Sequence, residues 1–201
     1  PAYVDTSYIQ DVVQLIPRMR SWTNTHYFSD VPIAITEYNW GAEGHINGAT
    51  TQADIYGIFG REGLDIATRW TTPATNSPTY NAMKMYRNYD GNKSTFGDVS
   101  VRATVVNPDN LSAFAAVRNS DGALTVMVIN KVAGSTPVTL SLAGFAGTGT
   151  AKVWQLTSTN VITAKPDISY AANSLAITVP GQSITLLVLP PVPPGFALQS
   201  A

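Results

Sequence analysis

The sequence predicts an α/β region over residues 1–96, followed by an all-β region over residues 97–190 that forms an antiparallel β-sandwich. In the first region, helical apolar spacing alternates with short apolar runs of strand length, an order typical of βαβ units around a parallel sheet. In the second region, short apolar runs recur between turn residues without helical spacing. Charge also thins along the chain, because the only charged side chains beyond Asp121 are Lys131, Lys152, Lys165 and Asp167.

The α/β region begins with a helical pattern. One face of this helix is formed by Ile9, Val12, Val13 and Ile16, and its candidate N-caps are Asp5, Thr6 and Ser7. Pro17 has no backbone N–H, so we expect the helix to kink or restart there and a second helical stretch to reach about Thr25. The short apolar run Val31–Glu37 then suits a strand that is covered on both faces of a parallel sheet.

Two further helices and one further strand follow in this region. After a glycine-rich loop, Thr50 or Thr51 is the expected N-cap of the second helix. Residues 64–70 form the second expected strand. Ser77-Pro78 is an N-cap followed by proline at the first helical position, and we expect this third helix to end near Gly91. Because two strands do not make a stable sheet alone, residues 1–96 are expected to be only the last part of a larger α/β domain.

The all-β region is expected to contain seven strands in an antiparallel sandwich. They are Asp98–Val106, Ala113–Arg118, Ala123–Asn130, Pro137–Leu142, Ala151–Leu156, Leu175–Val179 and Ser183–Leu189. Asp121-Gly122, between two alternating runs, is a strong hairpin signal. The strand Ala123–Asn130 is apolar on both faces and is therefore expected at the centre of the fold. Residues 191–201 are expected to be a Pro-rich tail.

Composition excludes several classes of protein. The 201 residues are 44% hydrophobic and 12% charged with a net charge of -1, which is not the signature of a disordered chain or of a basic nucleic-acid binder. There is no cysteine, so disulfides, thiolate chemistry and cysteine-based zinc sites are excluded. The sequence contains no run of about 18 apolar residues, the length that a membrane-spanning helix needs. We therefore expect neither a nucleic acid nor a membrane as a partner.

Glu37 is the strongest candidate for catalysis. It lies at the C-terminal end of its predicted strand, and enzymes built on parallel strands hold their active sites at that end. Regular alternation would place Glu37 on the same face as Ile33 and Ile35. The alternative interpretation is a strand-end carboxylate that caps a loop or pairs with an arginine.

Other residues near the ends of the two strands are candidates for binding a sugar. Trp70 ends the second strand and could offer its flat ring to the C–H face of a sugar, although it could also pack under a loop. Four residues in and beyond the end of the first strand could hydrogen-bond to a ligand or stack on it: Tyr38, Asn39, Trp40 and His45. Asn39 could instead serve only its own turn.

A second carboxylate is needed for glycoside hydrolysis, which uses one acid and one nucleophile or base. Glu43 lies in the loop and could approach, whereas Glu62 follows a helix and is expected on its outer side. Asp54 and Asp65 are expected on solvated surfaces. We therefore expect the second carboxylate to be missing from this chain.

Three segments of the sequence resemble glycoside hydrolase family 44, the endoglucanases and xyloglucanases: Ile35–Gly41 (ITEYNWG), Thr51–Leu64 (TQADIYGIFGREGL) and Met85–Gly91 (MYRNYDG). The resemblance runs from Pro1 into the all-β region and is densest from Ile33 to Gly97. It implies the last part of a (β/α)8 TIM-like barrel followed by a β-sandwich. It also implies retaining cleavage of cellulose-type or xyloglucan chains by a secreted enzyme.

The resemblance also implies roles for individual residues. Glu37 matches the family's nucleophile, and Trp70 matches a sugar-stacking tryptophan. The family's acid/base glutamate follows an asparagine, and no Asn-Glu pair occurs here, so this residue is expected in the missing N-terminal part of the same enzyme. Trp40 stands where members often carry tyrosine. The resemblance implies no required cofactor, although calcium is possible in the full-length family fold.

Two other functions remain open. The all-β region could be a non-catalytic carbohydrate-binding module, although its aromatic residues are few. The chain could also come from another retaining barrel-plus-sandwich glycosidase, such as an arabinofuranosidase or a xylosidase. Under the favoured hypothesis, the partners are a β-glucan polysaccharide and the missing part of the enzyme, and the 201 residues are inactive alone.

Overall fold

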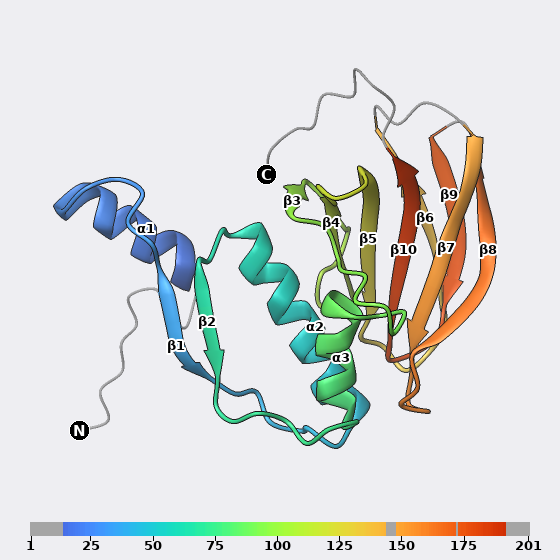
Figure 1. Ribbon diagram of the computed structural model, residues 1–201, viewed down its shortest axis with the longest axis horizontal. Helices are drawn as coiled ribbons and strands as arrows, with labels where there is room; N and C mark the ends of the chain where they lie inside the picture. The colour runs from blue at the N-terminus through green and yellow to red at the C-terminus, as the bar shows by residue number, and fades with distance from the viewer. Residues whose placement is uncertain (1–13, 144–147, 172, 192–201) are drawn as a thin grey trace. The chain divides into compact units, whose positions relative to one another are not determined.

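The computed structural model describes residues 14–143, 148–171 and 173–191, which form three helices and ten strands. Their contacts define two compact units (Figure 1). The smaller unit comprises the chain up to Asn39 together with Glu62–Thr71, and the larger unit comprises Trp40–Arg61 and the chain from Thr72 onward. The domain boundaries expected at residues 96/97 and 190/191 remain predictions. None of the described helices is both long and apolar enough to cross a membrane.

The smaller unit contains helix α1 (Leu15–His26) and the parallel strands β1 (Ala34–Tyr38) and β2 (Ile66–Arg69). Pro17 lies in the first turn of α1, where backbone N–H groups have no partner within the helix, so proline is tolerated there. The helix runs to the predicted end near Thr25. The predicted earlier helix over Ile9–Val13, with its caps, lies outside the described residues.

A carboxylate links the elements of the smaller unit. The Asp65 carboxylate accepts a hydrogen bond of 2.8 Å from the Ile33 backbone N–H and lies 3.6 Å from the Arg20 guanidinium. Arg20 also donates to the carbonyl of Gly63 at 2.7 Å. These contacts hold the start of β1 beside the start of β2 and tie both to α1. Asp65 still keeps 45% of its side chain exposed, so the expected solvated position is found.

In the larger unit, eight strands form one continuous antiparallel sheet in the order β3-β4-β5-β10-β7-β8-β9-β6. The strands are β3 (Val99–Val101), β4 (Leu111–Val117), β5 (Ala123–Asn130), β6 (Thr136–Ser141), β7 (Thr148–Leu156), β8 (Thr163–Ala171), β9 (Ser174–Val179) and β10 (Ser183–Pro191). The sheet curls so that β6 and β9 lie behind β10 and β7 (Figure 1), giving a sandwich from a single sheet.

The sheet corrects the strand prediction in two places. The strand β8 was missed, because Thr163–Ala171 is mostly exposed, carries Pro166 and lacks an apolar alternation. The strand predicted over Asp98–Val106 is limited to Val99–Val101.

Two apolar cores lie on opposite faces of the sheet. The outer core packs helices α2 (Ile46–Arg61) and α3 (Pro78–Arg87) against side chains such as Met127 and Leu186. The inner core fills the curl and contains Val128 and Leu187. Every residue of β5 is buried, as its apolar pattern on both faces predicted.

The start of α2 differs from the prediction, whereas the start of α3 agrees with it. Helix α2 begins at Ile46, so Thr50 lies inside the helix and is buried rather than capping it. The Ser77 side chain caps α3 by accepting a hydrogen bond of 3.2 Å from the Tyr80 backbone N–H. Glycine at position 57 lets α2 approach β4, because a Cβ there would lie 2.1 Å from the Phe114 ring.

The predicted hairpin at Asp121-Gly122 joins β4 to β5. Gly122 has a φ of 71°, the left-handed conformation that glycine adopts without strain. The Arg118 guanidinium donates two hydrogen bonds to the Asp121 carboxylate, at 2.9 and 2.7 Å, and a third to the Tyr89 hydroxyl at 2.8 Å. The bonds from Arg118 hold the pKa of Asp121 below its usual value.

Candidate active-site strands and their relatives

Glu37 is the penultimate residue of β1 and its side chain is exposed. Strands β1 and β2 run parallel, so Glu37 lies toward the C-terminal end of a parallel pair. The register shifts between Ile35, opposite Ala67, and Tyr38, opposite Arg69. Two residues of β1, Thr36 and Glu37, therefore face a single residue of β2. Such a bulge re-aims side chains, so the regular alternation with Ile33 and Ile35 does not continue unbroken to Glu37.

Trp70 follows β2 directly and is 62% exposed. Its backbone N–H donates a 2.9 Å hydrogen bond to the carbonyl of Tyr38, the residue after Glu37. The peptide bond between Trp70 and Thr71 is cis. Within the smaller unit, the exposed indole is thus held beside the end of the strand that carries Glu37.

Asn39 and Arg69 fasten the two strand ends together. The Asn39 amide donates to the carbonyl of Trp70, and Arg69 donates to the Asn39 amide oxygen at 3.2 Å and to the carbonyl of Thr71. Asn39 therefore bridges β1 and β2 instead of serving only its own turn. Arg69 was not predicted as a site residue, because a single arginine at a strand end carries no pattern that assigns it a role.

The remaining candidates divide between the two units. Tyr38 is only 7% exposed, which leaves little of its ring for stacking on a ligand. Trp40 and His45 belong to the larger unit, and Trp40 is 59% exposed. The His45 ring nitrogen Nδ1 accepts a 3.2 Å hydrogen bond from the backbone N–H of Asn47. His45 therefore caps the start of α2, where Thr50 or Thr51 was expected to do so.

Comparison with known proteins finds similar glucanases. No family model matches the chain. The chain is 39% identical over 136 residues to Endoglucanase A of Paenibacillus lautus, a match to 65% of this chain and 19% of that protein. It also resembles the solved structure of CelM2, a bifunctional glucanase-xylanase from a metagenome library, with 63% identity and a TM-score of 0.87 over 95% of this chain and 37% of CelM2.

A second solved structure names the family. The Paenibacillus polymyxa xyloglucanase of glycoside hydrolase family 44, solved with xyloglucan, shares 30% identity and a TM-score of 0.82 over 94% of this chain. Over most of its length, the chain thus resembles glycoside hydrolase family 44. It spans 19% of the Endoglucanase A relative, 37% of CelM2 and 39% of the xyloglucanase.

Asp54 has a structural role in the larger unit. Asp54 of α2 accepts hydrogen bonds from the Ser112 hydroxyl and, at 2.6 Å, from the Lys131 ammonium. Its side chain is 19% exposed, so the predicted solvated position was wrong: Asp54 ties α2 to the sheet. The backbone carbonyl of Glu43 accepts from the Thr79 N–H at 3.3 Å, and Glu62 directly follows α2.

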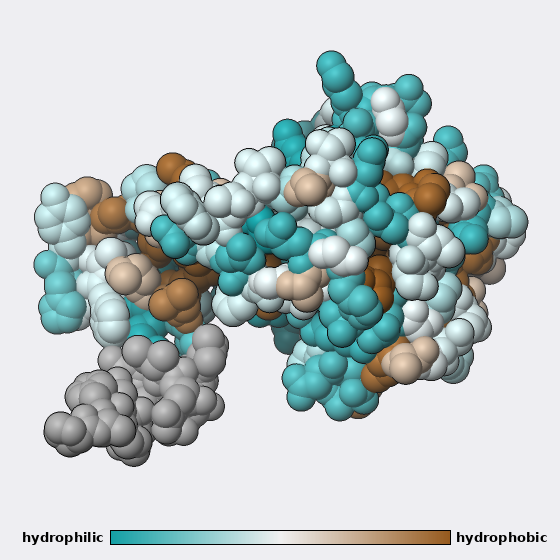
Figure 2. All heavy atoms as spheres, turned by 90° about the horizontal axis from the view of Figure 1, so that it is seen from below, coloured by the Kyte–Doolittle hydropathy of each residue, from teal (hydrophilic) through white to brown (hydrophobic). Residues whose placement is uncertain are grey.

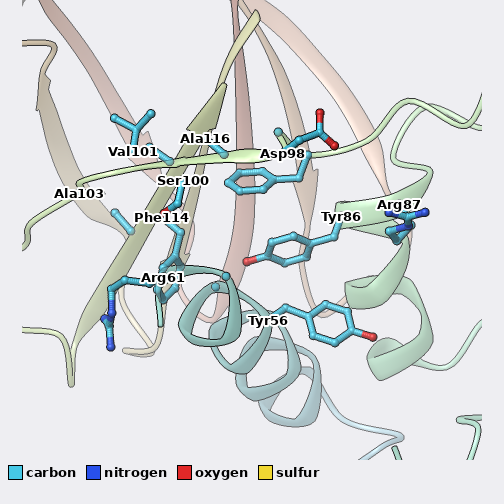
Figure 3. Close-up of a pocket in the computed structure, with 16 residues that line it drawn as sticks. Tyr56, Arg61, Tyr86, Arg87, Asp98, Ser100, Val101, Ala103, Phe114 and Ala116 are labelled. Atoms are coloured by element: carbon cyan, nitrogen blue, oxygen red, sulfur yellow. The ribbon is translucent and has the colours of Figure 1, made fainter. Parts of the chain in front are cut away.

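One apolar pocket of the larger unit is lined by none of the predicted site residues. A pocket of about 440 Å³ lies beside α2 and α3 at the edge formed by β3 and β4, with Tyr56, Tyr86 and Phe114 among its walls (Figure 3). Burial raises the pKa of the Tyr86 hydroxyl well above its usual range, and that hydroxyl donates to the carbonyl of Ala53 at 2.8 Å. This hydroxyl is therefore protonated at neutral pH and engaged within the fold, and Asp98 also lines the pocket. Within the described residues, no three His, Asp or Glu side chains gather as a metal site.

Proposed function

We propose that this chain is the C-terminal part of a secreted, retaining endo-β-1,4-glucanase that acts on cellulose-type or xyloglucan chains. Residues 1–96 would then be the last part of a (β/α)8 barrel and residues 97–190 its appended sandwich. The observation that carries the proposal is the exposed Glu37 carboxylate toward the C-terminal end of a parallel strand, beside the exposed Trp70. The names of the similar proteins support the substrate class.

The exposure of the parallel pair supports a missing remainder of the barrel. Parallel strands are normally covered on both faces, yet Ile66 of β2 is 56% exposed, and Figure 2 shows apolar surface over α1, β1 and β2. In the proposed enzyme, further strands and helices cover these side chains. The same missing polypeptide supplies the acid/base glutamate.

The proposed reaction needs two carboxyl groups and water. The Glu37 carboxylate attacks the anomeric carbon while the second carboxyl group protonates the leaving glycosidic oxygen, which forms a glycosyl–Glu37 ester. That second group then takes a proton from water, and the water releases the sugar with its original configuration. Retention requires the two carboxyl groups to lie about 5–5.5 Å apart. Trp70 would stack on the sugar, and Asn39 and Arg69 would hold the strand ends in place.

The test replaces Glu37 by glutamine in the full-length enzyme. We expect turnover of a soluble glucan to fall by about four orders of magnitude, because the attacking charge is lost, with the circular dichroism spectrum unchanged. The matched control is Glu43→Gln, which alters another glutamate close in the sequence and should keep activity within about threefold of the wild type. A loss of tenfold or less in Glu37→Gln would remove Glu37 as nucleophile. Hydrolysis by the purified 201-residue chain would contradict the missing acid/base group.

A further inference from the structure

A polar pocket of about 490 Å³ lies in the larger unit, between α3, the turn that follows it, and the sheet. Its walls include Asn81 and Lys84 of α3, Tyr89 and Asp90 of the turn, Trp154 of β7 and Asn160 of the loop between β7 and β8. Its volume falls in the range of small-ligand sites. None of the residues predicted from the sequence as site residues lines it.

A chain of amide hydrogen bonds fixes the orientation of Asn81. The Asn81 Nδ2 donates to the carbonyl and to the Oδ1 of Asn160, at 3.1 and 2.9 Å, and the Asn160 Nδ2 donates to the carbonyl of Asn76 at 2.7 Å. Because Nδ2 faces two acceptors, the amide cannot be flipped. The Asn81 Oδ1 accepts no hydrogen bond from any described residue and keeps contact with solvent. It is therefore available to accept a hydrogen bond from a ligand hydroxyl in the pocket.

Two donors in the pocket are also without partners in the described part of the chain. The ammonium of Lys84 makes no ion pair or hydrogen bond there, and neither does the indole N–H of the half-buried Trp154. The Trp154 ring lies 5.5 Å from the Tyr89 ring, whose hydroxyl is held by Arg118. The pocket thus presents a positioned aromatic wall, two donors and one acceptor.

The charges of the pocket indicate a neutral ligand. Lys84 contributes one positive charge and Asp90 one negative charge, so neither an anion nor a cation is favoured by the sum. The Asp90 carboxylate is already engaged by the Asn92 N–H at 2.8 Å and the Ser94 hydroxyl at 2.6 Å. A pyranose ring matches the remaining groups, because its C–H face stacks on an indole and its hydroxyls both donate and accept.

We propose that this pocket is a binding subsite for a neutral saccharide. Trp154 stacks on one pyranose ring, Lys84 and the Trp154 N–H donate to its hydroxyls, and the Asn81 Oδ1 accepts from one. The choice of a β-1,4-glucan as ligand rests on the proposed function, whereas a neutral saccharide follows from the pocket alone. The subsite would hold a glucan chain independently of the chemistry at Glu37.

The experiment titrates the ¹⁵N-labelled 201-residue chain with cellohexaose and follows the indole N–H signals of its four tryptophans. The Trp154 signal is assigned by its loss in Trp154→Phe, which keeps an aromatic ring. We expect this signal to shift and saturate at millimolar cellohexaose. Lys84→Ala should raise the dissociation constant about tenfold, since it removes one charged hydrogen bond and alanine preserves the helix. The matched control is Arg87→Ala, an exposed basic residue of α3 outside this pocket.

Two results would overturn the subsite: a Trp154 signal that does not move, or a dissociation constant that is the same in Lys84→Ala and the wild type. The Trp70 signal separates this inference from the proposed function. A shift of Trp70 without Trp154 rejects the subsite alone. If Glu37→Gln keeps its activity while Trp154 still responds, the proposed nucleophile fails and the subsite stands.

Discussion

Strands β5 and β1 were both predicted from short apolar runs, but they have different surroundings. In β5, every side chain is buried, with Met127 facing the helices and Val128 facing the curl of the sheet. In β1, four of the five residues are exposed or only partly buried. A strand that is apolar on both faces needs two covering layers. The chain provides both layers for β5, and for β1 we propose that further polypeptide provides them.

The largest effect is expected from truncating leucine side chains of β10, the strand next to β5, on either face of the sheet. Leu186 and Leu187 of β10 are fully buried, the first in the outer core and the second in the inner core. Leu186→Ala and Leu187→Ala should each lower the free energy of unfolding by about 2–5 kcal/mol, because each leaves a cavity. Urea denaturation followed by circular dichroism measures this. A cost below about 1 kcal/mol for one of them would show that its face is not covered.

An intermediate effect on stability is expected when low pH protonates Asp121 in the hairpin between β4 and β5. Asp121 has a pKa below its usual value because Arg118 donates to it, so its contribution to stability is complete above the unfolded-state pKa of about 4 and is lost as pH falls through the folded pKa. Asp121→Asn should therefore lose less stability than the wild type between about pH 6 and pH 2.5. Thermal unfolding midpoints across this range provide the measurement. Equal acid sensitivity in both proteins would contradict a charged pair at this turn.

The smallest effect is expected on the exposed pair of strands. Ile66→Thr in the 201-residue chain should change the free energy of unfolding by no more than about 0.5 kcal/mol, because Ile66 is 56% exposed. In the full-length enzyme the same substitution should cost clearly more, since the proposed barrel would bury the side chain. An equally small cost in both proteins would argue against covering layers over β2.

Local signals predicted most of the helices and strands, whereas contacts between residues far apart in the sequence could not be predicted from them. The Asp121-Gly122 hairpin, the Ser77 cap and the central position of Ala123–Asn130 follow from neighbouring residues. Asp54 could not be placed in this way, because its partners Ser112 and Lys131 are 58 and 77 residues away. The same limit applied to β8, whose exposed residues carry no apolar period.

The candidate site likewise contains features that the local sequence indicates and features that depend on strand pairing. Glu37 and Trp70 were recognised because strand ends are visible in the sequence, and both side chains are exposed at those ends. The link between Asn39 and Arg69 depends on the pairing of β1 with β2, which spans 30 residues. The bulge at Thr36 and Glu37 also depends on that pairing, so regular alternation alone could not predict the direction of the Glu37 side chain.

Helices α2 and α3 share the outer core with β4, β5, β7 and β10. A gene fragment that starts at Gly97 would encode the sheet without these helices and would leave Met127, Ile129 and Leu186 facing water. Such a fragment should be prone to self-association rather than serve as an independent module. Recombination that exchanges the sheet between related enzymes is therefore expected to succeed only when the two helices are inherited with it.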